Sequence, residues 1–265
     1  MKRIIVCIKP VPDPKHWDKV SMDPDTGTLK REGIPSIINP LDKHALEAAL
    51  SIREDKGGEV VLLSMAPPFA EATLREGLAM GADRAVLLSD PVFAGSDTLA
   101  TAHILGAGCQ WVGEFDLLLL GNSSIDGSTA QVCSQVAELL DIPNVMHVIG
   151  LDRQGSDKMV ITQKIENGYA RLEASLPLVI SVRKELNKPR YTPFTGIIAA
   201  ESKEIKVLSN DDLGLDLGLV GLEGSPTKMA GLEVRRFQRA REHLEGSPDE
   251  IVRQLVDRIY QYGII

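Results

Sequence analysis

Four short apolar runs recur along the first half of the sequence, and each is followed by Pro, Gly or small polar residues that end regular structure. The runs are RIIVCIK, EVVLLSM, RAVLLSD and FDLLLLG, which begin at residues 3, 59, 84 and 115. Their Val, Ile and Leu content is typical of strands that are buried on both faces of a parallel sheet. This repeat therefore predicts the core of the fold.

Stretches with helical periodicity separate the runs. DKHALEAALSIRED places Leu46 and Leu50 on one helical face, and PFAEATLREGLAMG does the same with Leu74 and Leu78. Strands that alternate with helices imply right-handed crossovers and a parallel sheet. We therefore expect an α/β protein with a Rossmann-like, parallel-sheet nucleotide-binding domain.

The character of the chain changes from Lys158 onward. MVITQKIEN, GYARLEASL and PLVISVRKE are rich in β-formers, and they surround an Asn-Gly pair at Asn167 and Gly168. This pattern predicts a hairpin with its turn at that pair, plus one strand that completes the sheet. After Pro189 the chain looks irregular and too glycine-rich to form a core alone.

The last segment, SPDEIVRQLVDRIYQYG, predicts a helix at the end of an extended carboxyl-terminal arm. Ser247 and Glu250 have the spacing of a capping box, and Pro248 suits the first turn. The apolar side chains Ile251 and Leu255 then share one helical face with Ile259. We expect such an arm to lean on a partner.

Composition excludes several classes of protein. The 265 residues are 43% hydrophobic and 25% charged, which is ordinary for a globular chain. A net charge of −8 with scattered cations argues against nucleic-acid binding. The first apolar run is too short for a signal peptide, and no run reaches the length of a membrane span. We expect a cytoplasmic protein without a membrane span.

Motifs for catalysis by side chains are missing from the sequence. Cys7, Cys109 and Cys133 lack metal-ligand spacing and are expected to be reduced thiols, and the five histidines show no ligand-like pairing. The chain also has neither a G-x-S-x-G elbow nor a P-loop, which disfavours a hydrolase or a nucleotide sensor. We predict no metal site and no catalytic side chain.

The richest cluster of small polar residues follows the fourth apolar run, in GNSSIDGSTAQV at residues 121–132. Ligands of parallel sheets bind beyond the carboxyl ends of the strands. Phosphate at a helix amino end needs free amides, small residues and hydroxyls, which Gly127 to Gln131 offer before a helix from Val132. Asp126 would repel a phosphate, so we expect it to orient the loop amides or contact a ribose. Taken alone, a simple turn and helix cap is an equally good interpretation.

Other strand and helix ends supply further candidates, each with a simpler alternative. Asn39 and Asp42 fit helix caps about twice as well as ligand contacts when taken alone. Cys7, Ile8 and Lys9 end the first strand, where backbone groups can pair with an adenine or a flavin. In GSDTLATA, two threonines offer hydroxyls, while Ser96 or Asp97 as a helix cap is the alternative; these threonines are Thr98 and Thr101.

Five ordered blocks carry a resemblance to a known family. VCIKPVPD, INPLDKHALEAAL, GLAMGADRAVLL, IDGSTAQV and LNKPRYTPF together resemble the beta subunit of electron transfer flavoprotein over nearly the whole chain. AGSDTLATA and DGSTAQV resemble the electron-bifurcating branch, in which the beta subunit binds FAD. Asn122-Ser123-Ser124 stand where Arg-Gln-Ala is frequent in the family.

The resemblance implies a function and its partners. It implies that the chain binds FAD, accepts electrons from NADH, and bifurcates them to a second flavin and to a low-potential acceptor such as ferredoxin. The alternative is a non-bifurcating beta subunit that holds a structural AMP. The implied partners are an alpha subunit and an acyl-CoA dehydrogenase-like enzyme.

The resemblance also divides the chain into two regions. Residues 1–190 are expected to form the nucleotide-binding domain, and residues 191–265 a recognition loop and an arm around the alpha subunit. Tyr191 and Phe194 would dock the dehydrogenase, although packing of Phe194 in its own subunit is an equal alternative. The strand ends and the resemblance together give one candidate cofactor site: Cys7, Ile8, Lys9, Asn39, Asp42, Ser64, Met65, Ala66, Asp97, Thr98, Thr101, Gly121, Asp126, Gly127, Ser128, Thr129, Ala130 and Gln131.

Overall fold

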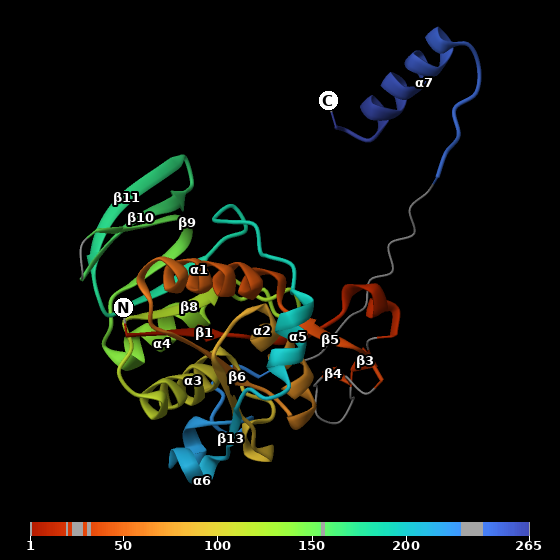
Figure 1. The fold of residues 1–265 in the computed structure, drawn as a ribbon. Coiled ribbons are helices and arrows are strands. Elements are labelled where there is room, and N and C mark those ends of the chain that lie inside the picture. Colours follow the sequence, from red (N-terminus) through yellow and green to blue (C-terminus); the bar gives the residue numbers. More distant parts are fainter. Residues whose placement is uncertain are drawn as a thin grey trace. The chain divides into compact units, whose positions relative to one another are not determined.

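A computed structural model describes residues 2–19, 21–22, 29–30, 33–154, 157–228 and 241–264. The chain forms two compact units, Met1–Met229 and Ala230–Ile265 (Figure 1). The first unit contains the sheet and the candidate site, and the described residues of the second, 241–264, contain one helix. None of the described helices combines the length and apolar character that a membrane span requires.

A nine-stranded sheet forms the centre of the first unit, in the order β11-β10-β9-β12-β8-β1-β6-β7-β13. In chain order its strands are β1 (Arg3–Cys7), β6 (Glu59–Met65), β7 (Arg84–Leu88), β8 (Leu117–Gly121), β9 (Asn144–Gln154), β10 (Lys158–Ile165), β11 (Gly168–Ser175), β12 (Leu178–Val182) and β13 (Ile205–Leu208). Two small two-stranded sheets lie outside it: β2 (Pro10–Pro12) with β5 (Ser36–Ile38), and β3 (Ser21–Met22) with β4 (Leu29–Lys30).

The predicted parallel core is confirmed. The four apolar runs form β1, β6, β7 and β8, and β1 pairs in parallel with both β6 and β8. Val6 in the central strand pairs with Leu62 on one side and Leu119 on the other. β12 is also parallel to β8, whereas β10 is antiparallel to β9 and β11. The fold is thus α/β with a mostly parallel sheet, as expected.

Helices cover both faces of the sheet, which is why its strands are apolar on both sides. α1 (Pro40–Lys56) and α2 (Glu71–Met80) pack on one face, and α3 (Thr98–Val112) and α4 (Val132–Leu140) pack on the other. Side chains of β1 alternate between the two layers: Ile4 and Val6 belong to the first core, and Ile5 and Cys7 to the second.

The predicted hairpin is present, but its turn lies one residue earlier than expected. Ile165 pairs with Gly168, so Glu166 and Asn167 form the two-residue loop between β10 and β11. The pairing register places the exposed Leu172 of β11 opposite the buried Ile161 of β10. The preceding strand β9 was not predicted.

Regular elements continue after Pro189, where an irregular chain was expected. α5 (Phe194–Ala200), β13 and α6 (Asn210–Leu213) follow one another, with the short 3-10 helix η4 (Leu217–Leu219) after them. β13 has only four residues, and its parallel pairing with β7 makes it a sheet edge. A four-residue strand leaves too little periodicity to be read from sequence. The role of residues 191–265 as a partner-binding arm stays a prediction.

The second unit contains α7 (Pro248–Gln261), and its predicted amino end is confirmed. Ser247 and Glu250 form the capping box, with Pro248 in the first turn. The helix leaves large apolar side chains exposed, among them Leu255 and Tyr260. The unit therefore presents an apolar helical surface.

Candidate functional site

The candidate site lies at a switch point of the sheet. β1 is followed along the chain by its neighbour β6, whereas β8 is reached only after β7 and α3 and lies on the other side of β1. Crossovers that diverge in this way leave a crevice beyond the carboxyl ends of the two strands. Lys9 follows β1 and Gly121 ends β8, so the loop at residues 122–131 begins at this crevice.

A buried carboxylate joins the two strand ends. Asp42, in the first turn of α1, accepts hydrogen bonds from the Lys9 amide (2.8 Å) and the Gly121 amide (3.1 Å). A Cβ atom at position 121 would lie 2.3 Å from Asp42 Oδ1. Glycine is therefore required for the strand to approach the helix this closely.

Asn39 ties the loop to the same carboxylate. Its Nδ2 donates to Asp42 Oδ1 (3.0 Å) and to the Ser123 carbonyl (3.0 Å), while its Oδ1 accepts from the Ile125 amide (3.2 Å). The Asn39 side chain makes no cap hydrogen bond to α1. Asn39 thus occupies the N-cap position of α1, but its side chain organises the loop instead of capping the helix.

Burial sets the ionisation of Asp42. Asp42 is only 6% exposed, and burial raises the pKa of its carboxyl group from 3.8 to about 6. Hydrogen bonds from Lys9, Asn39 and Gly121 stabilise the charged form and limit the rise in pKa. The carboxylate is thus mostly ionised at neutral pH and titrates in the weakly acidic range.

Ser124 organises the loop itself. Its Oγ accepts from Lys9 Nζ (3.2 Å) and from the Gly127 amide (3.3 Å), and its carbonyl accepts from the amide (2.9 Å) and hydroxyl (3.1 Å) of Ser128. Sequence reasoning missed Ser124, since nothing distinguishes it from neighbouring serines except contacts with a distant strand end.

Lys9 and Asp126 form an ion pair across the crevice. Lys9 Nζ lies 2.7 Å from Asp126 Oδ1, with the Asp126 side chain 3% exposed and that of Lys9 45% exposed. From sequence, Asp126 was expected to orient the loop amides or contact a ribose, because its charge would repel a phosphate, and Lys9 was expected to act through its backbone. The ion pair neutralises the carboxylate and places an exposed ammonium group beside the loop.

The amino end of α4 is open. The helix begins at Val132, as predicted, and its N-cap residue Gln131 makes no side-chain cap hydrogen bond. Uncapped amides at a helix amino end carry partial positive charge. Gly127, Ser128 and Thr129 are exposed in front of it.

The backbone of this loop is also strained. Ser128 and Ala130 have positive φ angles of 53° and 54°, a conformation that residues other than glycine seldom adopt. Such strain persists where the surroundings impose it, and it concentrates at ligand-binding sites.

The amino end of α3 faces that of α4 through one side-chain contact. Thr98 Oγ1 donates to Gln131 Oε1 (3.2 Å), and Thr101 lies one turn further along α3. Asp97 caps α3 at the amides of Leu99 and Ala100, and its other oxygen accepts from Thr227. The cap interpretation thus describes Asp97, whose carboxylate is occupied within the chain.

The remaining predicted residues line the ends of β1 and β6. The Ile8 amide donates to the Leu63 carbonyl, and the Lys9 carbonyl accepts from the Asn39 amide, so these backbone groups are used inside the chain. Ser64 is fully buried, and its hydroxyl has no partner among the described residues. Met65 and Ala66 are partly buried beside it.

The potential metal ligands are dispersed, and the three cysteines are buried, in the part of the chain that the structure describes. Across the described residues, no three His, Cys, Asp or Glu side chains gather as metal ligands would. Cys7, Cys109 and Cys133 are buried, and burial raises their pKa values, to about 12 for the latter two. Buried thiols of this kind stay protonated and are poor nucleophiles.

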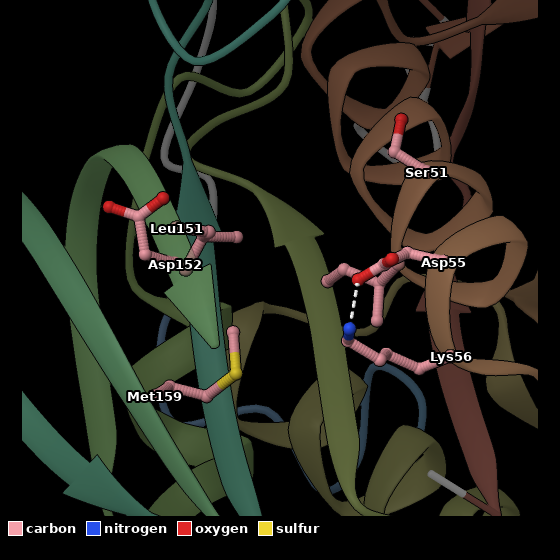
Figure 2. Close-up of a pocket in the computed structure, with 7 residues that line it drawn as sticks. Ser51, Asp55, Lys56, Leu151, Asp152 and Met159 are labelled. Carbon is pink, nitrogen blue, oxygen red and sulfur yellow. Dashed lines mark ion pairs between the residues drawn. The ribbon is translucent and has the colours of Figure 1, made fainter. Parts of the chain in front are cut away.

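A separate pocket lies near the other end of α1. It has a volume of about 250 Å³ between α1 and the strands β9 and β10 (Figure 2). Asp55 and Lys56 form an ion pair across its α1 side, with Asp152 and Met159 opposite. None of the predicted site residues lines this pocket, so it is distinct from the crevice.

The two predicted docking residues are exposed. Tyr191 is 89% and Phe194 is 75% exposed, which contradicts packing of Phe194 in the core of its own chain. Phe194 begins α5 and is not in a loop. A Cβ at Gly196 would lie 2.2 Å from the Ala79 carbonyl oxygen, so this glycine allows close helix packing and is not a flexible hinge.

Comparison with known proteins places these features in a family. Residues 26–213 match the family model described as Electron transfer flavoprotein domain. The electron transfer flavoprotein subunit beta of Thermoanaerobacterium thermosaccharolyticum is 46% identical over 263 residues, covering 99% of each chain.

Two further relatives carry names that mention reductases. The caffeyl-CoA reductase-Etf complex subunit CarD of Acetobacterium woodii is 46% identical over 228 residues, covering 86% of each chain. The acryloyl-CoA reductase electron transfer subunit gamma of Anaerotignum propionicum is 39% identical over 270 residues, covering 99% of this chain and 100% of the relative. The chain belongs to the electron transfer flavoprotein beta-subunit family.

Proposed function

We propose that this beta subunit binds FAD in the crevice between β1 and β8 and takes electrons from NADH. The observation that carries the proposal is the uncapped amino end of α4, with exposed small residues in front of it. Free amides and the helix dipole bind phosphate without requiring a lysine. We infer that the FAD pyrophosphate lies against this helix end.

The side chains around the helix end suit that ligand. Thr129 is exposed and offers a hydroxyl donor, whereas the hydroxyls of Ser128 and Thr98 already donate to the Ser124 carbonyl and to Gln131. The Lys9 ammonium neutralises Asp126, so the nearest loop carboxylate does not repel an anion. Asn39 holds the loop in place, because its Oδ1 accepts from the Ile125 amide while its Nδ2 donates to Asp42.

Bound FAD would supply the redox chemistry, accepting a hydride from NADH and sending its two electrons along separate routes, to a second flavin and to a low-potential acceptor such as ferredoxin. The residues of this chain bind and orient the cofactor and limit its contact with water. No side chain here is proposed as a nucleophile or a general base.

A structural AMP is the second candidate ligand, because a single phosphate suits the same helix end. We place FAD first because AGSDTLATA and DGSTAQV resemble the bifurcating branch, and because two relatives are named as components of CoA-reductase systems. The two candidates predict different flavin contents in the assembled protein.

Beta subunits of this family pair with an alpha subunit and form complexes with dehydrogenases or reductases. We propose that the arm at residues 191–265 supplies much of the alpha-subunit contact. α7 suits this role, since Val252, Leu255 and Tyr260 are 58%, 49% and 64% exposed. We further propose that Tyr191 and Phe194 contact an acyl-CoA dehydrogenase-like enzyme.

Flavin content tests the choice between FAD and AMP. The chain is co-expressed with its alpha subunit, and the purified heterodimer is analysed for flavin and for released AMP. The proposal expects about two flavins per heterodimer, and reduction of flavin when NADH is added. About one flavin together with one AMP would overturn FAD binding by this subunit and establish the alternative.

A further inference from the structure

Four apolar side chains gather around α5 without a cover. Phe194, Ile197 and Ile198 have the i, i+3, i+4 spacing of one helical face, and Tyr191 lies just before them. Their exposed fractions are 75%, 49%, 60% and, for Tyr191, 89%. We call these four residues the docking face. The helix α5 itself packs against α2 (Figure 1).

The chain that leads into the docking face is fastened to α1. Arg190 donates to both carboxylate oxygens of Glu47, from Nε (2.8 Å) and from one terminal nitrogen (3.0 Å). The same guanidinium reaches Glu54 two turns later (3.1 Å), and the Arg190 amide also donates to Glu47 (3.0 Å). We call Arg190, Glu47 and Glu54 the Arg190 clamp.

A neighbouring contact repeats this attachment. The Asn187 amide group donates to the His44 carbonyl (2.9 Å), and its oxygen lies 2.9 Å from His44 Nδ1.

Burial favours a raised pKa for Glu47, but hydrogen bonds and the charge of Arg190 outweigh it and lower the pKa. The clamp is therefore ionised at neutral pH.

The far end of α5 is fastened to α2. Arg75 donates to the carbonyls of Ala200 (2.7 Å) and Lys203 (2.7 Å), and Lys203 Nζ donates to the Leu78 carbonyl (3.0 Å). Gly196 brings the middle of α5 against the Ala79 carbonyl. The docking face is thus exposed and yet held at both ends.

This combination matters because a seven-residue helix is unstable by itself. Without the attachments, docking would have to order the helix and its side chains, which weakens binding. With them, that cost is met during folding. Bidentate contacts from a planar guanidinium also fix direction as well as distance, which a lysine does not.

We propose that Arg190 is a positioning residue that presents the docking face to a CoA-substrate dehydrogenase or reductase. The inference rests on the proposed docking function of Phe194. The occupant is chosen because two relatives are named for CoA reductases and because the surface is apolar and on this chain's exterior. Arg190 acts through the clamp and does not itself contact the reacting groups.

The test measures the affinity of the purified heterodimer for its partner dehydrogenase. Arg190→Gln should raise Kd at least tenfold, while flavin content and reduction by NADH stay unchanged. Lys188→Gln is the matched control. It removes the same charge only two residues from Arg190, and the Lys188 side chain is exposed. The control should change Kd less than twofold. A change below twofold for Arg190→Gln, or an equal change in both variants, would overturn the proposal.

A double-mutant cycle with Phe194→Ala separates positioning from general destabilisation. If Arg190 acts by presenting Phe194, then Arg190→Gln should weaken binding much less in the Phe194→Ala background than in the wild type. Equal fold-changes in both backgrounds would refute positioning. If Phe194→Ala alone leaves Kd unchanged, the docking function fails and the inference fails with it, while flavin content still reports on FAD binding.

Glu54→Gln provides a milder variant should Arg190→Gln fold poorly. Arg190 keeps its contacts with Glu47 in this variant, so the protein should fold and load flavin normally. Its Kd should rise by a smaller factor of about three, and amide hydrogen exchange across α5 should accelerate. Unchanged affinity together with unchanged exchange would show that the clamp does not govern docking.

Discussion

The two ends of the parallel strands are built from different chemistry. We call the end where the strands begin the amino edge, and the end where they finish the carboxyl edge. At the amino edge, where β1, β6 and β7 begin, the Glu59 carboxylate forms ion pairs with both Arg3 (2.7 Å) and Arg84 (2.6 Å). Asp83 also accepts from the Val60 amide (2.7 Å). Each of these four charged side chains has a charged or backbone partner within the chain.

At the carboxyl edge, backbone groups and small side chains predominate, beside one ion pair between Lys9 and Asp126. Asp42 is held by two amides and by Asn39, and the loop beyond it exposes Gly127, Ser128 and Thr129. The uncapped end of α4 adds partial positive charge there. This edge has unused binding capacity, which is what a ligand site requires.

The pKa values of Glu59 at the amino edge and of Asp42 at the carboxyl edge shift in opposite directions. Burial favours a higher pKa for Glu59, but hydrogen bonds from Arg84 and Arg3 outweigh it and lower the pKa. For Asp42, burial dominates and raises the pKa to about 6. Paired charge stabilises the fold at the amino edge, whereas burial of Asp42 costs stability at the carboxyl edge, beside the candidate site.

The largest effect is expected from Gly121→Ala at the carboxyl edge. The new Cβ would meet Asp42 Oδ1 at 2.3 Å and backbone atoms at 2.8 Å, so the strand end must move away from α1. We expect a loss of about 3 kcal/mol in unfolding free energy, together with loss of flavin. Denaturant unfolding and flavin analysis measure both. Gly127→Ala, whose Cβ would lie 3.4 Å from Ser124 Oγ, is the control for unfolding free energy; an equal loss of stability would contradict the close-approach argument.

The next effect concerns the pH dependence caused by Asp42. A pKa of about 6 in the folded state, against 3.8, means that the folded state binds the proton more tightly. Asp42 ionisation therefore costs stability as pH rises through this window. Relative to wild type, Asp42→Asn should gain about 2 kcal/mol between pH 4 and pH 7, whatever its constant offset. A stability difference that is independent of pH would show that Asp42 is not perturbed.

Glu59→Gln should weaken the amino edge while sparing the site. It leaves Arg3 and Arg84 without their shared carboxylate, and we expect a loss of about 2 kcal/mol at pH 7. Because the folded pKa is lowered, the wild-type advantage is present above the unfolded pKa and disappears as pH falls through the folded value. Flavin content should not change. Loss of flavin in this variant would break the contrast between the two edges.

Thr129→Leu should weaken nucleotide binding without unfolding the chain. The larger side chain blocks approach to the amino end of α4 and removes an exposed hydroxyl, at a cost of about 1 to 3 kcal/mol in binding. Flavin retention during dialysis of the heterodimer measures the effect. Thr129→Ser keeps the hydroxyl and the space, and it should retain flavin. Full retention in Thr129→Leu would place the phosphate elsewhere.

Sequence predicted those parts of the molecule that depend on neighbouring residues. The runs that form β1, β6, β7 and β8 carry their own apolar signal, and the amino end of α7 follows from a local capping pattern. The start of α4 at Val132 follows from the small polar run before it. β9 and β13 were missed because the partners of these strands, not their own periodicity, define them.

The side-chain network of the site has the same limitation. Sequence placed residues 121–132 and Asn39 at the site, but it did not foresee that Ser124 holds Lys9, which is 115 positions away. Arg190 likewise binds Glu47 across 143 positions. Contacts of this range are set by the folded topology, and a single sequence contains no local trace of them.

The smallest effect is expected from Lys9→Met, which removes the ion pair at the carboxyl edge. The Lys9 side chain is 45% exposed, so solvent screens its charge and the loss of stability should stay below about 1 kcal/mol. Asp126 then loses its neutralising partner beside the anion site, and flavin affinity should fall several-fold, more steeply at low salt. Titration of flavin-depleted heterodimer with FAD at two ionic strengths measures this. Lys43→Met removes the ammonium that pairs with Glu76 on α2 and should leave FAD affinity unchanged. If Lys9→Met destabilises the fold as strongly as Glu59→Gln, the carboxyl edge is held by charge after all, and the distinction between the two edges fails.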